Sequence, residues 1–466
     1  MQLDLSSIDE KLLAAVRAIS ETVRAAGGRA LMVGGAVRDL MRGEKVKDVD
    51  IEVFGIGPEK LKEALSGRFE FDACGLSFGV LKIKHLDIDV ALPRRETKRG
   101  SGHKGFLIDS DPSLSVAEAA LRRDFTVNAM YFDLLDGSFE DPYGGREDLM
   151  CGVLRHISPK FAEDPLRVLR GVQFIARFDL APAEETVGLC RTIGIEDLPC
   201  ERLFEEWSKL LLKGVRISKG LEFLRSTGWI GYFPELQRLI GCKQAPEWHP
   251  EGDVWNHTLL CLDAYAARRT GDAAEDLIVG LAVLCHDMGK PDTSRFDPRV
   301  NRIRSLGHDE AGVKPALSFL GRLTNEERIL KEVPPLVQCH MQPFSLWRNK
   351  SGDSAIRRLA ARVGRIDRLV RVARADSEGC LLRDDKKAEG VAALEWLEAA
   401  AARLSVAASV PRPILMGRDL ISLGYRPSAE FGKYLSVCYE AQLDGSFSDH
   451  DGAVAFFMKR FGGRAG

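Results

Sequence analysis

Two aspartates separated by one residue, Asp48 and Asp50, stand in the segment KDVDIEVFG, whose composition is typical of a β-strand. A strand turns alternate side chains to the same face, so both carboxylates project together, with Glu52 next on that side. Carboxylates this close repel one another unless a cation lies between them, and hard oxygen ligands suit Mg²⁺. The spacing therefore predicts a magnesium site, with a solvent-exposed strand edge as the alternative.

The stretch just before it, LMVGGAVRDLMRG, predicts a strand, a Gly-Gly turn and a short helix. Gly34 and Gly35 let the backbone approach a ligand closely, and the free N–H groups at a helix N-terminus attract phosphate. Arg38 lies within the first turns of that helix, where its guanidinium could clamp a phosphate oxygen. In this order the pieces indicate a nucleoside-triphosphate site for nucleotidyl transfer, whereas the glycine pair alone would indicate only a tight turn.

Histidines supply a second group of residues with metal chemistry. The chain has only 9 His, and four of them fall in one series with two aspartates: His257, His286, Asp287, His308, His340 and Asp376. Imidazoles suit Ni²⁺, Co²⁺, Mn²⁺ or Fe²⁺ better than Mg²⁺, and such a metal lowers the pKa of a water for phosphoester hydrolysis. Because His286 and Asp287 are neighbours on a helix, their side chains diverge, and only the folded chain decides whether both reach one ion.

The elements that must position these residues follow from periodicity and from Gly, Pro and capping signals. Residues 7–26 and 58–66 predict helices, and residues 80–92 predict a strand pair. An amphipathic helix is expected to begin at Asp164 as N-cap, with Pro165 in the first helical position. Residues 184–240 and 387–404 are expected to be helical, with Arg202 and Glu206 paired across one turn.

Composition sets limits on partners and compartment. The 66 Lys and Arg nearly balance the 68 Asp and Glu, so any nucleic-acid surface must be a local basic patch. The segment PRRETKRGSGHKGF is one candidate: it predicts a mobile loop that approaches phosphates, or else a solvated linker, and its cations are Arg94, Arg95, Lys98, Arg99 and Lys104. No signal peptide or membrane-spanning run is evident, and the 10 Cys have no CxxC spacing, so reduced thiols in the cytoplasm are expected.

The succession GGAVRDLMRG and KDVDIEVFG resembles the signature of the tRNA nucleotidyltransferase/poly(A) polymerase family, within the DNA-polymerase-beta-like superfamily. The resemblance implies a third catalytic carboxylate on the later strand LDIDVALPR, where Asp89 matches it best and Glu52 and Asp87 are competitors. It also assigns LRRDFTVNAM to the ribose and phosphates of the nucleotide, through Arg123 with support from Asp124 and Asn128. Asp124 could instead be an ordinary N-cap.

The same resemblance implies that Asp164 and Arg167 read the incoming base and that Arg170 reaches the triphosphate. Cytosine and adenine both present an amino donor beside a ring-nitrogen acceptor, whereas uracil and guanine present a carbonyl beside an N–H. A carboxylate with a guanidinium therefore accepts C or A and rejects U or G. The sequence departs from the family where Gln173 stands in place of a second Arg, which puts a phosphate or base contact at that position in doubt.

The histidine series resembles the HD phosphohydrolase superfamily. The resemblance implies that His257, His286, Asp287 and Asp376 bind a first metal and that His308 and His340 are the extra ligands of a second. By family analogy, 2′,3′-cyclic phosphodiester or phosphomonoester ends of RNA are the expected substrates. The alternative is an HD fold that binds no ion.

The resulting expectation is an α+β protein: a polymerase-beta-like nucleotidyltransferase head with a small mixed sheet, followed by an all-α body, an HD domain and a C-terminal tail. The expected domains are 1–150 (head), 151–242 (helical neck and body), 243–405 (HD domain) and 406–466 (tail). Magnesium in the head, tRNA, CTP and ATP are the expected cofactor and partners, without a membrane or an obligatory protein partner.

Three functions remain open from the sequence. The first is a CCA-adding tRNA nucleotidyltransferase, and the second is a CC-adding, A-adding or poly(A)-polymerising enzyme. The third is an HD phosphohydrolase whose head serves as an RNA-binding module. The intact carboxylates of the head argue against the third function.

Overall fold

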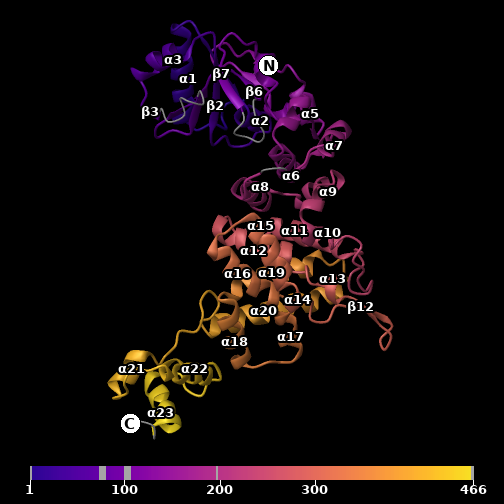
Figure 1. The fold of residues 1–466 in the computed structure, drawn as a ribbon, viewed down its shortest axis with the longest axis vertical. Helices are drawn as coiled ribbons and strands as arrows, with labels where there is room; N and C mark the ends of the chain where they lie inside the picture. The colour runs from indigo at the N-terminus through magenta and orange to yellow at the C-terminus, as the bar shows by residue number, and fades with distance from the viewer. Residues whose placement is uncertain (1–2, 73–79, 99–105, 196–197, 463–466) are drawn as a thin grey trace. The chain divides into compact units, whose positions relative to one another are not determined.

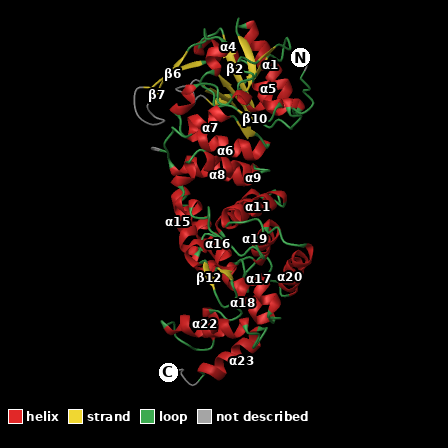
Figure 2. Ribbon diagram, turned by 90° about the vertical axis from the view of Figure 1, so that its right-hand side faces the viewer, coloured by secondary structure: helices red, strands yellow, loops and turns green. Residues whose placement is uncertain are grey.

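A computed structural model describes residues 3–72, 80–98, 106–195 and 198–462. The chain divides into two compact units, residues 1–210 with 219–229 and residues 211–218 with 230–466. The strands of the first unit and the helices of the second are seen in Figure 1 and, coloured by type, in Figure 2. The described residues contain no helix with the length and apolar character needed to cross a membrane.

The first unit contains a mixed sheet that has seven strands within the described residues, in the order β3-β4-β5-β2-β1-β8-β9. Strands β2 and β5 are parallel, and the other neighbours are antiparallel. The strands are β1 (Arg29–Val33), β2 (Val49–Phe54), β3 (Phe71–Asp72), β4 (Val80–Ile83), β5 (Ile88–Ala91), β8 (Tyr131–Phe132) and β9 (Phe139–Glu140).

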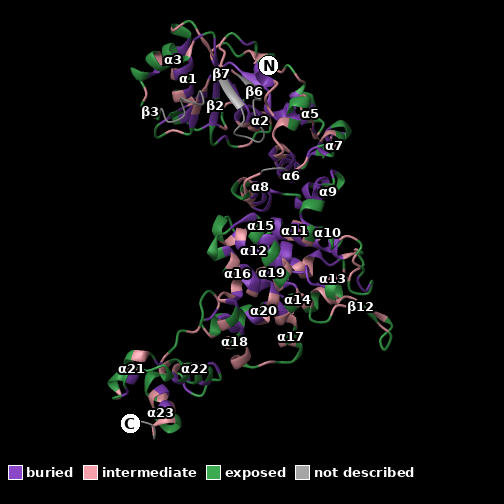
Figure 3. Ribbon diagram, in the orientation of Figure 1, coloured by how far each residue is buried: buried purple, intermediate pink, exposed green. Residues whose placement is uncertain are grey.

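Alternation along β2 explains how the sheet presents its carboxylates. Val49, Ile51 and Val53 are buried, whereas Asp50 between them is exposed. On the face of the sheet that carries Leu31 and Val33, these two residues pack in a buried apolar cluster with alanines of later segments. The apolar residues of β2 are therefore buried, whereas Asp50 near its start stays exposed. Figure 3 shows much of the sheet of the first unit in the colour of buried residues.

The helices of the first unit include those predicted at 7–26, after the glycine pair, at 58–66 and from Asp164, together with two short helices over Val116–Ala120 and Gly145–Met150 that were not predicted. They are α1 (Glu10–Ala25), α2 (Gly35–Met41), α3 (Pro58–Ser66), α4 (Val116–Ala120), α5 (Gly145–Met150), α6 (Leu166–Phe178), α7 (Glu184–Cys190), α8 (Cys200–Lys213) and α9 (Ile217–Ser226). Short 3-10 helices lie at Thr126–Asn128 and Pro159–Glu163, and β10 (Val153–Leu154) pairs with β11 (Ala181–Pro182). Helix α6 begins at Leu166, one residue later than predicted, because Pro165 is its N-cap while the Asp164 side chain accepts from the Leu166 N–H at 3.1 Å.

The basic segment is only partly the loop that was expected. Strands β6 (Arg94–Lys98) and β7 (Phe106–Ser110) form an antiparallel pair, so the prediction of a mobile loop is wrong for those residues. Hydrogen bonds between the two strands take the place of the hydrogen bonds to water that a solvated linker would make. Arg99 and Lys104 lie outside the described residues.

The second unit is almost entirely helical. Its helices are α10 (Pro234–Gln237), α11 (Val254–Ala267), α12 (Ala273–Cys285), α13 (Lys290–Thr293), α14 (His308–Ala311), α15 (Val313–Leu323), α16 (Glu327–Cys339), α17 (Gln342–Arg348), α18 (Asp353–Val363), α19 (Ile366–Gly379), α20 (Asp384–Arg403), α21 (Gly417–Ser422), α22 (Glu430–Leu443) and α23 (His450–Phe461), with a 3-10 turn at Trp229–Tyr232. A small hairpin of β12 (Arg295–Asp297) and β13 (Arg302–Arg304) interrupts the helices where no strand was predicted.

Candidate active sites

Three carboxylates gather at the start of β2. Asp50 and Asp89 are direct partners in the parallel pairing of β2 with β5, and Asp48 lies two residues before Asp50. Although Asp50 is accessible to solvent, desolvation by the protein around it raises its pKa, the charges of Asp48 and Asp89 raise it further, and Arg123 lowers it. An excess of negative charge held at one place by the strand register is an arrangement that a divalent cation would relieve.

The structure separates the three candidates for the third carboxylate. Asp87 is exposed before β5 and contributes only its backbone carbonyl, which accepts from the Val49 N–H at 2.9 Å. Glu52 is 1% exposed and is bound by arginines. Asp89 lies across from Asp50, with Lys82 Nζ 3.4 Å away. The geometry therefore favours Asp89, whose catalytic role stays a prediction.

Gly34 lies close to both the Asp50 carboxylate and the Arg123 guanidinium. Its φ of +75° falls in the left-handed region, where a side chain would be strained. A Cβ at this position would lie 3.3 Å from Asp50 Oδ2 and 3.4 Å from Arg123 Nη1. The glycine pair therefore brings backbone, carboxylate and guanidinium together at the N-terminus of α2, as a phosphate-binding turn requires.

Glu52 anchors the arginines of the LRRDFTVNAM motif. Its two oxygens accept from Arg122 Nη2 at 2.6 Å and from Arg123 Nη2 at 3.1 Å, and Tyr131 donates its hydroxyl to the second oxygen at 3.1 Å. Burial by itself would raise the pKa of Glu52, but the two guanidiniums overcome it and hold the pKa below its ordinary value. The sequence had offered Glu52 as a metal ligand, whereas the fold uses it to hold Arg123 beside Gly34.

We expect Glu52→Gln to lower the free energy of unfolding by about 3–5 kcal/mol, because it leaves two guanidiniums without their buried counter-charge. Since the folded pKa of Glu52 is depressed, its contribution is present above the unfolded carboxyl pKa of about 4.3 and is lost as pH falls through the folded value. Urea denaturation at neutral pH measures the difference. Glu59→Gln, at an exposed position of α3, is the matched control, and equal stability of the two variants would contradict the assignment.

The rest of the motif joins the sheet to α6. Asp124 is buried and accepts from Asn128 Nδ2 at 3.0 Å and from Arg170 Nε at 2.7 Å. Burial would raise the pKa of Asp124, but Arg170 and Asn128 hold it below its ordinary value. Arg38 Nη1 in turn donates to Asn128 Oδ1 at 2.6 Å. Four of the residues predicted to hold the nucleotide, Arg38, Asn128, Asp124 and Arg170, therefore form one connected chain of hydrogen bonds.

Arg38 is more enclosed than a phosphate clamp would be. It is 4% exposed, donates to Asp39 at 2.7 and 2.9 Å, and lies over the Phe178 ring at 4.2 Å. Burial lowers its pKa below the ordinary value. A role in phosphate binding stays a prediction, and it would require the guanidinium to leave these partners.

Asp164 and Arg167 stand at the start of α6, and their neighbours hold both side chains. Asp164 Oδ2 accepts from Arg202 Nη2 at 3.0 Å, and Arg167 donates to the carbonyls of Lys160 at 2.9 Å and Arg122 at 2.6 Å. The predicted pair of Arg202 with Glu206 is therefore wrong. Arg202 reaches across to Asp164 at the start of α6, a partner that tertiary packing supplies. Glu206 instead binds Lys209, three residues later on the same helix, at 2.9 Å.

Gln173, the departure from the family pattern, is 3% exposed on α6. Its Oε1 has no hydrogen-bond partner among the described residues. A side chain this enclosed is poorly placed to contact a phosphate, so we do not expect Gln173 to replace the arginine contact of the family pattern.

The second unit brings the six predicted HD residues together. His257 Nε2 lies 3.0 Å from Asp376 Oδ1 and 3.4 Å from His286 Nε2. His308 Nε2 lies 3.2 Å from His340 Nε2. Asp287 stands between the two groups, with Oδ2 3.3 Å from His286 and Oδ1 3.4 Å from His308. His286 follows the last residue of α12, which is why it and its neighbour Asp287 can turn to one centre.

The electrostatics of this centre suit a cation. Burial and the neighbouring imidazoles lower the pKa of His340 to about 4, which keeps its lone pair available. Burial would raise the pKa of Asp376 and of Asp287, but the surrounding imidazoles hold both below the ordinary value. Donors of this kind fit a divalent transition metal, and the roles of the individual ligands stay predictions.

Four further residues of this region were not predicted as site residues. Lys290 Nζ lies 2.7 Å from Asp287 Oδ2, and Glu251 Oε1 lies 2.9 Å from His257 Nδ1 and 2.8 Å from His249 Nδ1. Cys380 is the fourth, 3.9 Å from both imidazoles. The spacing of His249, Glu251 and His257 was a usable signal, but Cys380 comes from a distant segment that only the fold brings near.

A cavity of about 410 Å³ opens onto the HD residues. It is lined by Asp287, His308, His340 and Asp376, and it has a cationic and an aromatic wall. The cations are Lys290, Arg302, Arg304, Arg348 and Lys386, and the aromatic residues are Trp248, Phe344 and Trp347. A phosphate with an attached ring system matches this lining.

A mixed sheet that presents paired aspartates beside a glycine turn defines a nucleotidyltransferase head. The sequence profile of the poly A polymerase head domain matches residues 30–155. The multifunctional CCA protein of Acinetobacter baumannii is 34% identical over 373 residues, 76% of this chain and 85% of that protein. That of Chromobacterium violaceum is 38% identical over 298 residues, 63% of this chain and 69% of that protein. The chain belongs to the tRNA nucleotidyltransferase/poly(A) polymerase family.

Solved structures agree on the fold. The CCA-adding enzyme of Bacillus stearothermophilus in complex with CTP aligns with a TM-score of 0.66 at 22% identity, over 98% of this chain and 99% of that one. The Thermotoga maritima CCA-adding enzyme complexed with tRNA aligns with a TM-score of 0.59 at 19% identity, over 98% of this chain and 97% of that one. The expected mixed head and helical body are therefore confirmed as the fold class.

Proposed function

We propose that this protein adds C, C and A to the 3′ end of tRNA, using CTP and ATP, in the cytoplasm. The observation that carries the proposal is the gathering of Asp48, Asp50 and Asp89 next to Gly34 and Arg123. The relatives that match most of this chain are named multifunctional CCA proteins. In the reaction, the tRNA 3′-hydroxyl oxygen bonds to the α-phosphorus of the nucleotide, its proton is released, and pyrophosphate leaves.

The residues at the start of β2 fit Mg²⁺, because they offer several hard oxygen atoms and an excess of negative charge. When bound by Asp48, Asp50 and Asp89, Mg²⁺ would supply charge compensation for the phosphates and favour deprotonation of the 3′-hydroxyl. Arg123, fixed by Glu52 and Tyr131, contributes positive charge beside the glycine turn. The protein thus contributes mainly positioning and charge, as phosphoryl chemistry requires.

Asp164 and Arg167 would select the base. The carboxylate accepts from the amino group of cytosine or adenine, and the guanidinium donates to the ring nitrogen. Arg202 holds Asp164, and two carbonyls hold Arg167, so little side-chain freedom is lost when a nucleotide binds. One fixed pair can therefore serve both CTP and ATP.

Transcripts of tRNA that end before C74, before C75 or before A76 (tRNA numbering) test the proposal. Each is incubated with labelled CTP, ATP, UTP or GTP and Mg²⁺. We expect C on the first two, A on the last, and no U or G. Addition of only C or only A would indicate a partial enzyme, and a long A tail would indicate a polymerase.

We further propose a phosphoesterase activity at the HD residues. Two features support it: His257, His286, Asp287, His308, His340 and Asp376 lie together, and the last four of these line a cavity that is also lined by several cationic side chains. A divalent Ni²⁺, Co²⁺, Mn²⁺ or Fe²⁺ ion would supply an activated water for hydrolysis. Arg302, Arg304 and Lys386 would attract the phosphate of an RNA end.

A further inference from the structure

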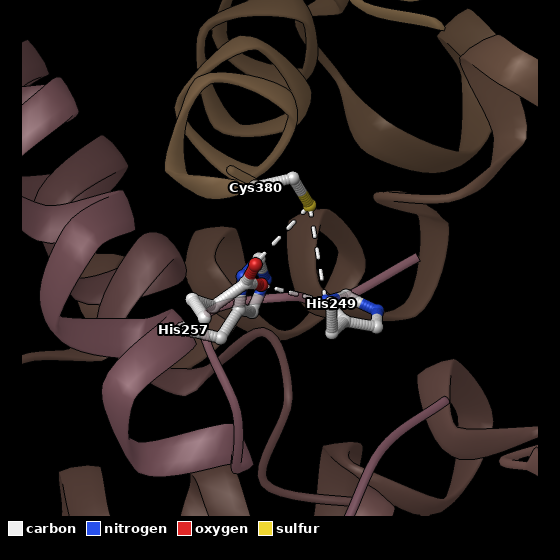
Figure 4. Close-up of side chains that lie close together, drawn as sticks. His249, His257 and Cys380 are labelled. Atoms are coloured by element: carbon white, nitrogen blue, oxygen red, sulfur yellow. Dashed lines mark hydrogen bonds and ion pairs between the residues drawn. The ribbon is translucent and has the colours of Figure 1, made fainter. Parts of the chain in front are cut away.

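A second group of soft and hard donors lies directly beside the HD residues. His249 and Glu251 precede α11, His257 is in its first turns, and Cys380 follows α19. Their donor atoms all lie within 4.8 Å of one another. Figure 4 shows His249, His257 and Cys380 directed toward a common point.

The separations between the donor atoms are close to those around a tetrahedral ion. Glu251 Oε1 lies 2.8 Å from His249 Nδ1 and 2.9 Å from His257 Nδ1, and Cys380 Sγ lies 3.9 Å from both nitrogens. Zinc bonds of about 2.0–2.3 Å would place neighbouring donors about 3.3–3.6 Å apart. The observed separations lie on both sides of that range, so small side-chain movements would complete the site.

An ion could also reach this group. His249 and Cys380 both line the 410 Å³ cavity. Glu251 is held in place because its other oxygen accepts from the Leu381 N–H at 3.1 Å. Orienting His257 toward the HD centre requires only the contact between Glu251 Oε1 and His257 Nδ1. The group holds two further donors, because Glu251 Oε1 also contacts His249 Nδ1 and Cys380 Sγ contacts both imidazoles.

We propose that His249, Glu251, His257 and Cys380 form a Zn²⁺ site that shares only His257 with the HD centre. Two imidazoles, a carboxylate and a thiolate are ligands that Zn²⁺ prefers over Mg²⁺ or Mn²⁺. The site uses Nδ1 of His257, whereas the HD residues Asp376 and His286 face its Nε2.

The two centres therefore compete for one imidazole. A neutral imidazole has a single lone pair, so an ion on Nδ1 leaves the proton on Nε2, where Asp376 accepts it at 3.0 Å. Zinc at the new site would inhibit the HD centre. This consequence rests on the proposed phosphoesterase activity, whereas the site itself does not.

Cobalt spectroscopy tests the site without any activity assay. We expect Co²⁺ added to the metal-free protein to give a near-ultraviolet thiolate-to-cobalt charge-transfer band that one equivalent of Zn²⁺ removes. Cys380→Ser should abolish the band, and His249→Ala should weaken Co²⁺ binding at least about tenfold. The matched control is Cys261→Ala, because Cys261 Sγ lies 3.4 Å from Nε2 and 3.7 Å from Nδ1 of His257 but is not one of the four proposed ligands.

Two results of the cobalt experiment would contradict the zinc site. A missing band in the unmutated protein, or a band lost in Cys261→Ala but kept in Cys380→Ser, would overturn the proposal. Thermal melting of each variant shows that it is folded. In a separate assay, Zn²⁺ should inhibit Mn²⁺-supported hydrolysis in the unmutated protein at concentrations at least about tenfold lower than in Cys380→Ser. If no variant hydrolyses phosphoesters, the phosphoesterase proposal fails, while the cobalt band still decides the zinc site.

Discussion

Nucleotide incorporation is expected to fall at least about a thousandfold in Asp50→Asn, because the change removes several kcal/mol of metal-mediated charge stabilisation from the transition state. Asp50 is the central carboxylate of the group: it pairs in register with Asp89, lies two residues from Asp48, and has its Oδ2 against Gly34. Incorporation of labelled C onto a tRNA transcript that ends before C74, with Mg²⁺, measures the loss.

The same substitution should not destabilise the protein. The pKa of Asp50 is raised, so its charged form is disfavoured in the folded chain and its contribution to stability becomes less favourable as pH rises through the carboxyl range. Asp50→Asn removes that penalty, and its melting temperature without metal should equal or exceed that of the unmutated protein. Asp87→Asn, an exposed aspartate just before the neighbouring strand, is the control and should keep its activity. Full activity in Asp50→Asn would rule out the proposed metal site.

The second large effect is expected at Asp376. Asp376→Asn should lower metal-dependent hydrolysis of a 2′,3′-cyclic nucleotide at least about a hundredfold, because it replaces a predicted ligand by a neutral amide. Asp376 Oδ1 lies 3.0 Å from His257 Nε2 and 3.8 Å from His286 Nε2, so it faces the two imidazoles that are predicted to bind the first metal with it. Hydrolysis of 2′,3′-cyclic AMP with added Mn²⁺ or Ni²⁺ gives the measurement.

Glu378→Gln provides the matched control, since Glu378 lies two residues later on α19 and binds Arg268 at 2.7 Å, away from the histidines. Incorporation of C and A onto tRNA should be unchanged in both variants, because the nucleotidyltransferase residues belong to the other unit. A parallel loss of both activities in Asp376→Asn would indicate a folding defect. Hydrolysis that persists in Asp376→Asn would place the reaction elsewhere.

Much of the head could be predicted from local pattern. The strand that carries Asp50 and Glu52, the turn at Gly34 and the helix over 58–66 depend on neighbours in sequence, and the structure has them as expected, although β2 begins at Val49, one residue after Asp48. The pairing of Arg202 with Glu206 was wrong, because helical spacing shows which residues can meet but not which other segment offers a nearer partner. Asp164 comes from that other segment.

By itself, the sequence determined which donors exist and which face of each element carries them. Only the tertiary structure decided that Asp89 lies against Asp50, because the register between two strands is a long-range property. It also decided that Glu52 is neutralised, because the arginines that bind it are about seventy positions away in the chain. Likewise, His286 and Asp287 reach one centre because α12 ends just before them, and Cys380 meets His249 because α19 ends beside the start of α11. Side-chain chemistry is local, whereas proximity is set by the packing of distant segments.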